Sequence, residues 1–380
     1  MQRGLGRIQE LSTIEDIEQL ETLCLKENGI RPNNVSYWNP SPCVSRKMEK
    51  SFIVCDIPSA VDYIFSYELG VSDKLLALVG LESGAKGVLV TPSGSTSILM
   101  VARYLSKLGV NQVTLLGPGY FTVPANLRAE GVDVQVSYLV RTDEGYCLPT
   151  SLDLNKVRVL WVTNPVYCTG VSYFPSDIQR FRQFLSGGGI IICDECLAWG
   201  GAELCRELGQ WPGFIGIYSP HKGLCTNGIK YSFIVLPHEV QNFFNDWADA
   251  LYGCLPASSV VAINHSLSLD FKRYRELFKC IVDKARDFVV ESATTNEIDV
   301  DWSTSGYLIT CYAKHVWQSK QMNVDFMKNL IIATSASFIP GIRNHFDPDI
   351  GLCFRVNLAR DDAAFRGALT RVFHYLHDLR

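Results

Sequence analysis

The sequence predicts an α/β fold, with a mainly parallel sheet in a large three-layer α/β/α domain and a smaller α+β domain at the C-terminal end. From about residue 60 onward, strand-like and helix-like segments take turns along the chain, which is typical of a parallel sheet flanked by helices. The segments 157–162 and 189–193 are strongly apolar, as strands buried on both faces should be. The length of 380 residues also exceeds the usual size of one hydrophobic core.

The predicted elements follow in order along the chain. A charged amphipathic helix at 12–28 precedes a proline-rich extended arm that includes Pro32 and Pro40. The large domain is expected to contain strands at 87–90, 112–116, 157–162 and 189–193, and helices at 95–108 and from about 123. A helical connector at 245–292, interrupted near Pro256, leads to strands at 307–312 and 352–358 and helices at 324–335 and 361–379. The predicted domains are 1–50 (helix and arm), 51–255 (large domain) and 256–380 (interdomain helix and small domain).

The composition is that of an ordinary globular protein. The chain has 47% apolar and 19% charged residues, and its 35 basic and 39 acidic residues give a net charge of −4. This balance gives no electrostatic reason to expect nucleic acid or an anionic membrane as a partner. No apolar run approaches the ~18 residues that a membrane helix needs, and the N-terminus lacks the apolar stretch of a signal peptide. We therefore expect a cytoplasmic protein.

Thirteen cysteines are scattered through the chain without a repeated pair spacing. The odd number and the lack of an export signal favour reduced thiols. Cys193 and Cys196 have the C-x-x-C spacing of some redox and metal sites. A single pair falls short of a complete set of metal ligands, so no metal is expected.

Lys222 is the most informative residue of the chain. It follows Ser219 by three residues and precedes Lys230 by eight, downstream of a strand that ends in Asp194. A lysine framed by a hydroxyl and a second cation suits a Schiff-base lysine beside a bound phosphate. Most lysines are solvated surface charges, so the interpretation depends on the other segments that follow predicted strands, where α/β sheets bind their ligands.

Two of these segments are suited to a phosphate and a flat ring. Gly94, Ser95 and Thr96 lie between a strand and a helix, where glycine, hydroxyls and the helix dipole favour a dianion. The alternative is an N-cap without a ligand. Tyr120 follows the next strand and suits stacking on a heterocycle, although packing alone would also explain it.

Three further segments carry polar side chains at the ends of strands. The turn that begins at Asn164 and ends at Gly170 places polar groups at the edge of the sheet. Asp194 ends an apolar strand, where a carboxylate needs a partner; a pyridinium nitrogen would serve, and a helix cap is the alternative. Arg355 lies in an apolar strand. Its planar guanidinium can bind a carboxylate with two hydrogen bonds, either that of the substrate or that of an internal salt bridge.

Taken in order, these segments resemble the class I/II aminotransferases, a family of fold-type I enzymes that use pyridoxal 5'-phosphate (PLP). The resemblance runs from about residue 37 to the C-terminus. It implies a PLP cofactor, with roles for Gly94, Ser95 and Thr96 (phosphate), Tyr120 (ring stacking), Asp194 (pyridine nitrogen), Ser219 (phosphate), Lys222 (Schiff base) and Arg355 (substrate carboxylate).

The chain departs from the family pattern at the cofactor's phenolic oxygen. The resemblance implies an asparagine and a tyrosine where this chain has Tyr167 and Leu197. We interpret either the Tyr167 hydroxyl or Asn164 as the replacement. Lys230 stands where the family has an arginine for the phosphate, and His221 stands where a small residue is common; it is interpreted as structural rather than as a proton shuttle.

The resemblance also implies a homodimer with composite active sites. Tyr67 approximates the tyrosine that the family lends to the phosphate of the neighbouring subunit, and Tyr63 is its rival. The arm near Trp38 and Asn39 is expected to contact the substrate, whose side chain the sequence does not reveal.

The leading functional prediction is an aminotransferase that acts on an α-amino acid. The changed contacts to the phenolic oxygen leave open elimination, replacement or cyclisation with the same cofactor. A regulatory protein with this fold is disfavoured, because such regulators carry a DNA-binding domain ahead of it and only about 35 residues precede it here.

Overall fold

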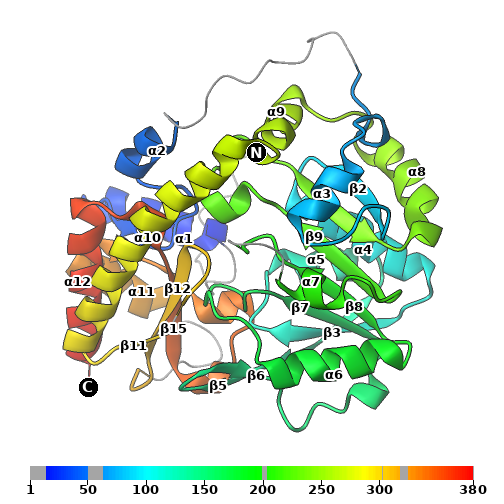
Figure 1. Cartoon of the computed structure of the whole chain (residues 1–380). Helices are drawn as coiled ribbons and strands as arrows, with labels where there is room; N and C mark the ends of the chain where they lie inside the picture. The colour runs from blue at the N-terminus through cyan, green and yellow to red at the C-terminus, as the bar shows by residue number, and fades with distance from the viewer. Residues whose placement is uncertain (1–13, 50–62, 199–202, 302, 317–323, 380) are drawn as a thin grey trace. The chain divides into compact units, whose positions relative to one another are not determined.

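The computed structural model describes residues 14–49, 63–198, 203–301, 303–316 and 324–379 (Figure 1). The chain forms two compact units. Unit 1 comprises the described residues within Met1–Lys47, Lys279–Asp301 and Leu308–Arg380, and unit 2 those within Met48–Phe278 and Trp302–Tyr307. The first part of the chain thus groups with the last, whereas the sequence analysis treated 1–50 as a separate arm. The predicted domain bounds stay a prediction.

Unit 2 is built on a seven-stranded sheet with the strand order β2-β10-β9-β8-β7-β3-β4. Its strands are β2 (Gly87–Thr91), β3 (Gln112–Gly117), β4 (Asp133–Tyr138), β7 (Val159–Thr163), β8 (Ile190–Asp194), β9 (Phe214–Tyr218) and β10 (Ser232–Leu236). Strand β10 runs antiparallel to both of its neighbours, and the other pairs are parallel. The carboxyl ends of the parallel strands and the start of β10 therefore share one edge of the sheet, which we call the carboxyl edge. The predicted mainly parallel sheet is confirmed.

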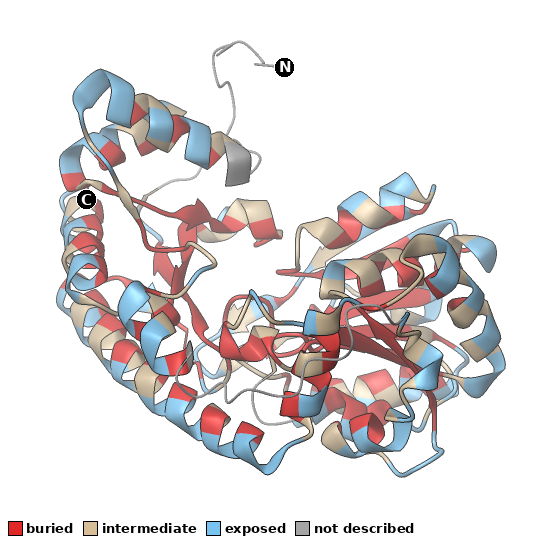
Figure 2. Cartoon of the chain, turned by 90° about the horizontal axis from the view of Figure 1, so that it is seen from above, coloured by how far each residue is buried: buried red, intermediate tan, exposed pale blue. Residues whose placement is uncertain are grey.

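Helices cover both faces of this sheet. They are α3 (Ser72–Leu78), α6 (Pro175–Ser186), α7 (Glu203–Leu208) and α9 (Ala257–Ser266) on one face, and α4 (Gly94–Lys107), α5 (Thr122–Ala129) and α8 (Gln241–Leu251) on the other. The strands alternate between two cores: Leu160 and Val162 face one, and Val159 and Trp161 face the other. Figure 2 shows the strands buried and the outer sides of the helices exposed. Apolar residues on both faces of a strand require two covering layers, so the three-layer prediction is confirmed.

A second, smaller sheet forms unit 1, in the order β11-β12-β15-β14. Its strands are β11 (Asp299–Val300), β12 (Leu308–Ala313), β14 (Ile339–Pro340) and β15 (Leu352–Asn357), and all neighbouring pairs are antiparallel. The accompanying helices are α1 (Ile14–Asn28), α2 (Pro42–Glu49), α11 (Val324–Thr334) and α12 (Ala363–His377), with α10 (Leu269–Thr295) belonging to both units. A short parallel pair joins β1 (Asn33–Asn34) to β13 (Ala336–Ser337). The α+β character predicted for the smaller part is confirmed.

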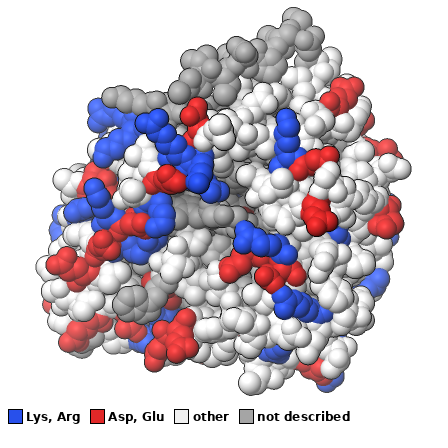
Figure 3. All heavy atoms as spheres, viewed as in Figure 1, with Lys and Arg blue, Asp and Glu red and all other residues white. Residues whose placement is uncertain are grey.

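None of the helices in the described residues combines the length and the apolar character that crossing a membrane requires. Positive and negative side chains are interspersed on the face of the molecule in Figure 3. Mixed charge of this kind fits the net charge of −4.

Candidate functional site

The predicted cofactor residues of unit 2 collect at the carboxyl edge of its sheet. Asp194 ends β8, and Ser219 directly follows the end of β9. The register pairs Thr91, at the end of β2, with Ser232, at the start of β10. The loop that enters β10 with Lys230 therefore lies at the same edge as the start of α4, which follows β2. Residues far apart in the sequence are adjacent here because the strands before them are adjacent.

Lys222 lies in the short 3-10 helix η3 (Lys222–Leu224), in the loop after β9. Its amide donates to the Ser219 carbonyl (3.0 Å), which fixes the start of the turn. Its Nζ lies 4.5 Å from the centroid of the Tyr120 ring. The Tyr120 and Tyr167 ring centroids are 5.7 Å apart with 39° between their planes. The structure therefore brings together the amine and the two aromatic rings that the sequence singled out.

Asp194 is buried and is held by the turn that follows it. Its Oδ1 accepts the amide N–H of Cys196 at 3.0 Å. The Cys196 thiol accepts the Ser219 hydroxyl at 3.2 Å. Burial raises the pKa of this thiol well above its usual range; the charge of Asp194 adds to the rise, and the charge of Lys222 opposes it. Cys196, which had no predicted role in the site, thus connects Asp194 and Ser219, which did.

The C-x-x-C pair does not form a joint site. Cys193 packs in the core that includes α6 and α7, whereas Cys196 packs in the core that includes α4. The two side chains therefore lie on opposite faces of the sheet. In the parts of the chain that the structure describes, no group of three or more His, Cys, Asp or Glu side chains is arranged to hold a metal ion.

The start of α4 lies close to Ser219 and Cys196 at Gly94. A Cβ atom on Gly94 would lie 3.2 Å from the Ser219 Oγ and 3.3 Å from the Cys196 Sγ, so a side chain there would crowd the gap between them. Ser93 caps the helix by accepting the amide of Thr96 at 3.2 Å. Ser95 is exposed and Thr96 is half-buried. Free amides, two hydroxyls and the positive end of a 14-residue helix meet at this point.

Ser97 does not contribute its hydroxyl to the polar groups at the start of α4. It is fully buried, and its hydroxyl is 2.7 Å from the Thr91 hydroxyl and donates to Ser232 at 3.1 Å. These contacts tie α4 to strands β2 and β10, so Ser97 belongs to the core beneath the loop.

Glu195 holds the turn beside the site, and sequence reasoning gave it no role. Its carboxylate accepts the Asn164 Nδ2 at 2.7 Å and the amides of Leu204 and Cys205 at 2.9 and 3.1 Å. Burial raises the pKa of Glu195 to about 7, and these hydrogen bonds oppose the rise. Glu195, and not Asp194, therefore binds the amides at the start of α7, and the helix-cap alternative for Asp194 is not what the structure has.

The hydrogen bond to Glu195 also determines what Asn164 offers to a ligand. Its donor, Nδ2, is directed at the Glu195 carboxylate. Its Oδ1 is buried and has no hydrogen-bond partner among the described residues. An amide oxygen accepts hydrogen bonds and does not donate them. Asn164 is thus poorly placed to donate to a phenolic oxygen, whereas a tyrosine hydroxyl such as that of Tyr167 carries a donor.

The segment 303–306 contacts the turn that carries Tyr167. The Gly170 carbonyl accepts the amides of Thr304 and Ser305 at 3.1 and 3.0 Å. Gly170 has a φ of +70°, and a Cβ atom there would overlap Ser303. Gly306 lies near the Leu197 carbonyl, with 3.4 Å between that oxygen and the position of a Cβ. This segment thus contacts the turn that carries Tyr167 at Gly170 and lies near the Leu197 carbonyl.

Arg355 occupies a second polar site, within unit 1. It is buried on β15, and its Nε and Nη2 donate to the Ser36 carbonyl at 3.2 and 3.1 Å. The guanidinium carbon lies 3.9 Å from the centroid of the Trp38 ring. Its Nη1 has no hydrogen-bond partner among the described residues, and none of the ion pairs found among them involves Arg355. Within the described parts of the chain, the internal salt bridge considered from the sequence is therefore not seen.

The remaining predicted residues lie on the surface of their units. The Asn39 carbonyl, in unit 1, accepts Arg360 Nη1 at 3.1 Å. In unit 2, Tyr63 and Tyr67 are 75% and 51% exposed. The rings of both tyrosines stack on Phe65, with centroids 6.2 and 5.4 Å from it. Both tyrosines remain candidates for a contact with a partner subunit.

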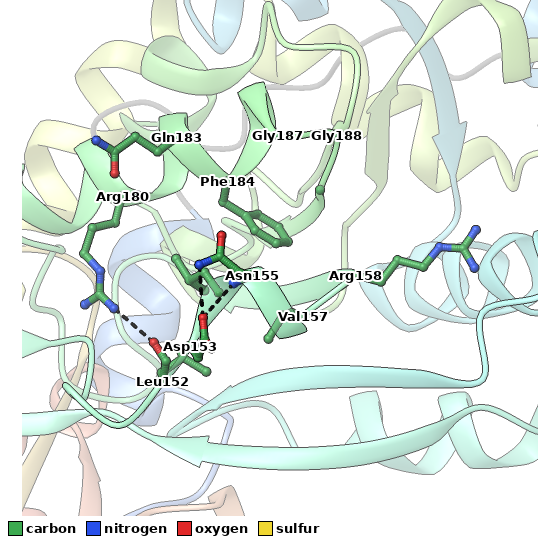
Figure 4. A pocket seen from close by; sticks show the side chains of 12 residues that line it. Leu152, Asp153, Asn155, Val157, Arg158, Arg180, Gln183, Phe184, Gly187 and Gly188 are labelled. Atoms are coloured by element: carbon green, nitrogen blue, oxygen red, sulfur yellow. Dashed lines mark hydrogen bonds between the residues drawn. The ribbon is translucent and has the colours of Figure 1, made fainter.

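A pocket of about 560 Å³ lies at the other edge of the sheet (Figure 4). It is lined by residues before β7, such as Asn155 and Arg158, by residues before β8, such as Gly188, and by α6. In Figure 4 the Arg180 guanidinium reaches the Leu152 carbonyl, at 3.3 Å. Because this pocket is at the amino ends of the strands, it is separate from the candidate site.

Comparisons with known proteins agree with this architecture. No protein-family profile matches the chain. Histidinol-phosphate aminotransferase of Cronobacter sakazakii is 23% identical over 164 residues, which cover 41% of this chain and 44% of that protein. The corresponding protein of Buchnera aphidicola is 20% identical over 156 residues, 40% of this chain and 42% of that protein. The chain thus spans less than half the length of the curated relatives it matches.

Solved structures match over nearly the whole chain. Aspartate aminotransferase from Thermus thermophilus with maleate has a TM-score of 0.76 and 14% identity, with 97% of each chain covered. N-Succinyldiaminopimelate aminotransferase from Mycobacterium tuberculosis has a TM-score of 0.73 and 16% identity, covering 94% of this chain and 96% of that one. The fold is that of the fold-type I aminotransferases. The resemblance predicted from the sequence is therefore confirmed for the fold.

Proposed function

We propose that the protein is a PLP-dependent enzyme that acts on the amino group of an α-amino acid, and that it is an aminotransferase. The observation that carries this proposal is the grouping of Lys222, Tyr120, Asp194 and Ser219 at the carboxyl edge, in a fold shared with aminotransferases. Sheets of this kind bind their ligands at that edge. The cytoplasmic location predicted from the sequence is part of the same proposal.

The residues at the carboxyl edge fit each end of PLP. The start of α4 at Gly94, Ser95 and Thr96, with the Ser219 hydroxyl beside it, suits the phosphate. Lys230 enters β10 at the same edge and would add a positive charge. Across the site, the buried Asp194 carboxylate would bind the protonated pyridine nitrogen, and the Tyr120 ring would stack on the pyridine.

Lys222 would hold the cofactor covalently through Nζ and later move a proton. When bound, PLP supplies an electron sink that stabilises negative charge at the substrate Cα. The neutral amine of Lys222, once displaced by the substrate, would take the proton from Cα as a general base. Lys222 is half-buried, and its Nζ lies over the Tyr120 ring, which keeps the amine within the candidate site.

Arg355 would bind the α-carboxylate of the substrate. Its Nε and one hydrogen of Nη2 are directed at the Ser36 carbonyl, while Nη1 has no partner among the described residues. The edge formed by Nη1 and Nη2 can therefore receive a carboxylate in a bidentate manner. Trp38 fixes the plane of the guanidinium from one side.

The active unit is proposed to be a homodimer. Tyr63 and Tyr67 are large, exposed aromatic side chains in a stacked row with Phe65. Their exposure supports the sequence-based expectation that one of them contacts the phosphate site of a second copy.

The experiment that tests the proposed function is a panel of amino acids mixed with the PLP-loaded protein. Transamination converts the cofactor to its amine form and releases a keto acid. Elimination, replacement or cyclisation leaves the cofactor in its aldehyde state and changes the substrate side chain. Absorbance and product mass, recorded together, separate these outcomes, and a protein that neither binds PLP nor changes any amino acid would refute the proposal.

One observation favours the second candidate, a side-chain lyase or cyclase with the same cofactor. Leu197 cannot donate a hydrogen bond from its side chain, and the Asn164 donor is directed at Glu195. Tyr167 is thus the remaining predicted donor to the phenolic oxygen of the cofactor. A different set of donors changes how strongly negative charge on that oxygen is stabilised.

Replacing Tyr167 by phenylalanine tests its role at the phenolic oxygen. We expect the pKa read from the pH titration of the bound cofactor's absorbance to rise by about one unit or more, because the lost hydrogen bond stabilises the deprotonated form. Phe121→Leu is the matched control, since Phe121 also packs on Tyr120, with ring centroids 4.9 Å apart. An unchanged titration in Tyr167→Phe would exclude this role for Tyr167.

A further inference from the structure

Helix α9 contacts the lysine loop of unit 2, which we define as residues 219–231. His265 and Ser266, at its C-terminal end, contact His221 and Tyr231; the nitrogen atoms of the two histidines are 3.1 Å apart, and the two hydroxyls are 2.6 Å apart. At its other end, Ser259 donates to the Lys230 carbonyl at 3.0 Å. One helix therefore fixes the loop at three positions.

The histidine pair is buried among aromatic rings. The exposed fractions of His221 and His265 are 0% and 3%. Phe271 lies 5.4 and 5.5 Å from the two rings, Tyr231 lies 5.9 Å from His221, and Tyr274 lies 5.3 Å from His265. The ring of His221 is thus directed into the core, and its structural role stays a prediction.

Burial disfavours the charged form of both histidines. Burial lowers the pKa of His221 to about 3, and the neighbouring His265 adds to that effect. Burial also lowers the pKa of His265, with Asp270 opposing the shift. A neutral imidazole has one N–H and one acceptor nitrogen, so the Nε2 and Nδ1 atoms that face each other form a directional hydrogen bond.

His221 is also the centre of the turn that presents Lys222. Its carbonyl accepts the amides of Leu224 and Thr226, both at 3.1 Å, and the Thr226 hydroxyl at 2.9 Å. The side chain and the backbone of His221 are therefore both fixed. Because Lys222 is the next residue, a shift of the His221 backbone would redirect the lysine side chain.

We propose that the hydrogen bond between His221 and His265 is a positioning device for Lys222, which sets the direction and the basicity of the lysine amine. The inference rests on the proposed function, since it assumes that Lys222 holds the cofactor. Two apolar side chains would fill the same space without the cost of burying polar groups. What the polar pair adds is a fixed distance and angle between α9 and the lysine turn.

The test compares variants of His265 in the PLP-loaded protein. His265→Leu removes the hydrogen bond, whereas His265→Asn keeps a polar atom near the position of Nδ1. Val260→Ala is the matched control, because Val260 is a buried residue of α9 that packs in the apolar core. The readouts are the PLP dissociation constant, the pKa from the bound cofactor's absorbance titration, the extent of borohydride labelling of Lys222, and the unfolding temperature without PLP.

We expect His265→Leu to raise the PLP dissociation constant about tenfold, the scale of one lost buried hydrogen bond, and to shift the absorbance pKa. His265→Asn should restore both in large part. Val260→Ala should lower the unfolding temperature and leave the absorbance pKa as in the wild type. Should His265→Leu not fold, His221→Gln, which keeps a polar atom near Nε2, and His221→Leu provide the same comparison from the other ring.

An absorbance pKa and a dissociation constant that stay at wild-type values in folded His265→Leu would overturn the inference alone. A shift in Val260→Ala as large as that in His265→Leu would also overturn it, because loss of packing would then explain both. A wild-type protein that takes up no PLP would overturn the proposed function, and this inference with it.

Discussion

Replacing Lys222 by alanine is expected to lower turnover of any amino-acid substrate by roughly 10³-fold or more, because both the covalent hold on the cofactor and the general base are lost. The same change should abolish the stable mass increase that borohydride reduction gives the PLP-loaded wild type. Peptide mapping of the reduced protein should place that mass on Lys222 and on no other lysine. The position of Nζ over the Tyr120 ring, 4.5 Å from its centroid, is the basis of this expectation.

Lys230→Gln is the matched control for Lys222→Ala. Both lysines lie in the same loop, but Lys230 is exposed, and its carbonyl is bound to Ser259. The variant should still be labelled at Lys222 and should need more PLP for saturation, since one positive charge near the phosphate is gone. Labelling at Lys230 in the wild type would contradict the assignment of the two lysines.

Replacing Arg355 by glutamine is expected to lower kcat/KM about 100-fold, which corresponds to about 3 kcal/mol of lost transition-state stabilisation. The reason is that the substrate carboxylate loses the charged partner of a buried pair. The kcat/KM of Arg355→Lys should lie between those of the wild type and Arg355→Gln, since lysine keeps the positive charge and lacks the planar guanidinium. Steady-state kinetics should show a larger effect on KM than on kcat if the arginine binds substrate and transition state alike. PLP binding should be unaffected in both variants.

Arg366→Lys controls for the loss of an arginine in unit 1. Arg366 makes a two-pronged ion pair with Asp361 on the surface, at 2.7 and 2.8 Å. Exposed pairs of this kind contribute little to stability, and we expect no change in kcat/KM. An Arg355→Gln enzyme that is as active as this control would show that the α-carboxylate is bound elsewhere.

The sheet and part of the grouping at its carboxyl edge could be predicted, because Gly94, Tyr120 and Asp194 each lie at the end of a strand recognisable from its apolar residues. Asp194 is the clearest case, since a carboxylate that ends a wholly buried strand must find a partner. Lys222 and Tyr120 were expected to lie near each other only because such sheets bind their ligands at the carboxyl ends of the strands. Their contact confirms that the strands before them share an edge.

The residues that support the site could not be predicted, because their partners are distant in sequence. His221 and His265 are 44 positions apart, and Ser36 and Arg355 are 319 apart. Nothing in the local sequence selects those pairs. The roles of Asp194 and Glu195 were also not separable, since two adjacent carboxylates look alike until the strand determines which side each one faces.

Strands β9 and β10 were missed for a different reason. They are adjacent antiparallel strands joined by a loop, within a chain where a helix was expected between strands. β9 also contains Gly216, and glycine weakens a strand pattern. The structure explains the glycine: a Cβ atom there would overlap the Tyr218 ring.

The reversed strand β10 has a consequence for the entropy of ligand binding. Because β9 and β10 pair directly, with Tyr218 opposite Phe233, both ends of the lysine loop are anchored at neighbouring points of one rigid edge. Closing a loop costs conformational freedom, and here that cost is met when the chain folds. A ligand that then meets the lysine has little left to order, so more of its contact energy can appear as affinity.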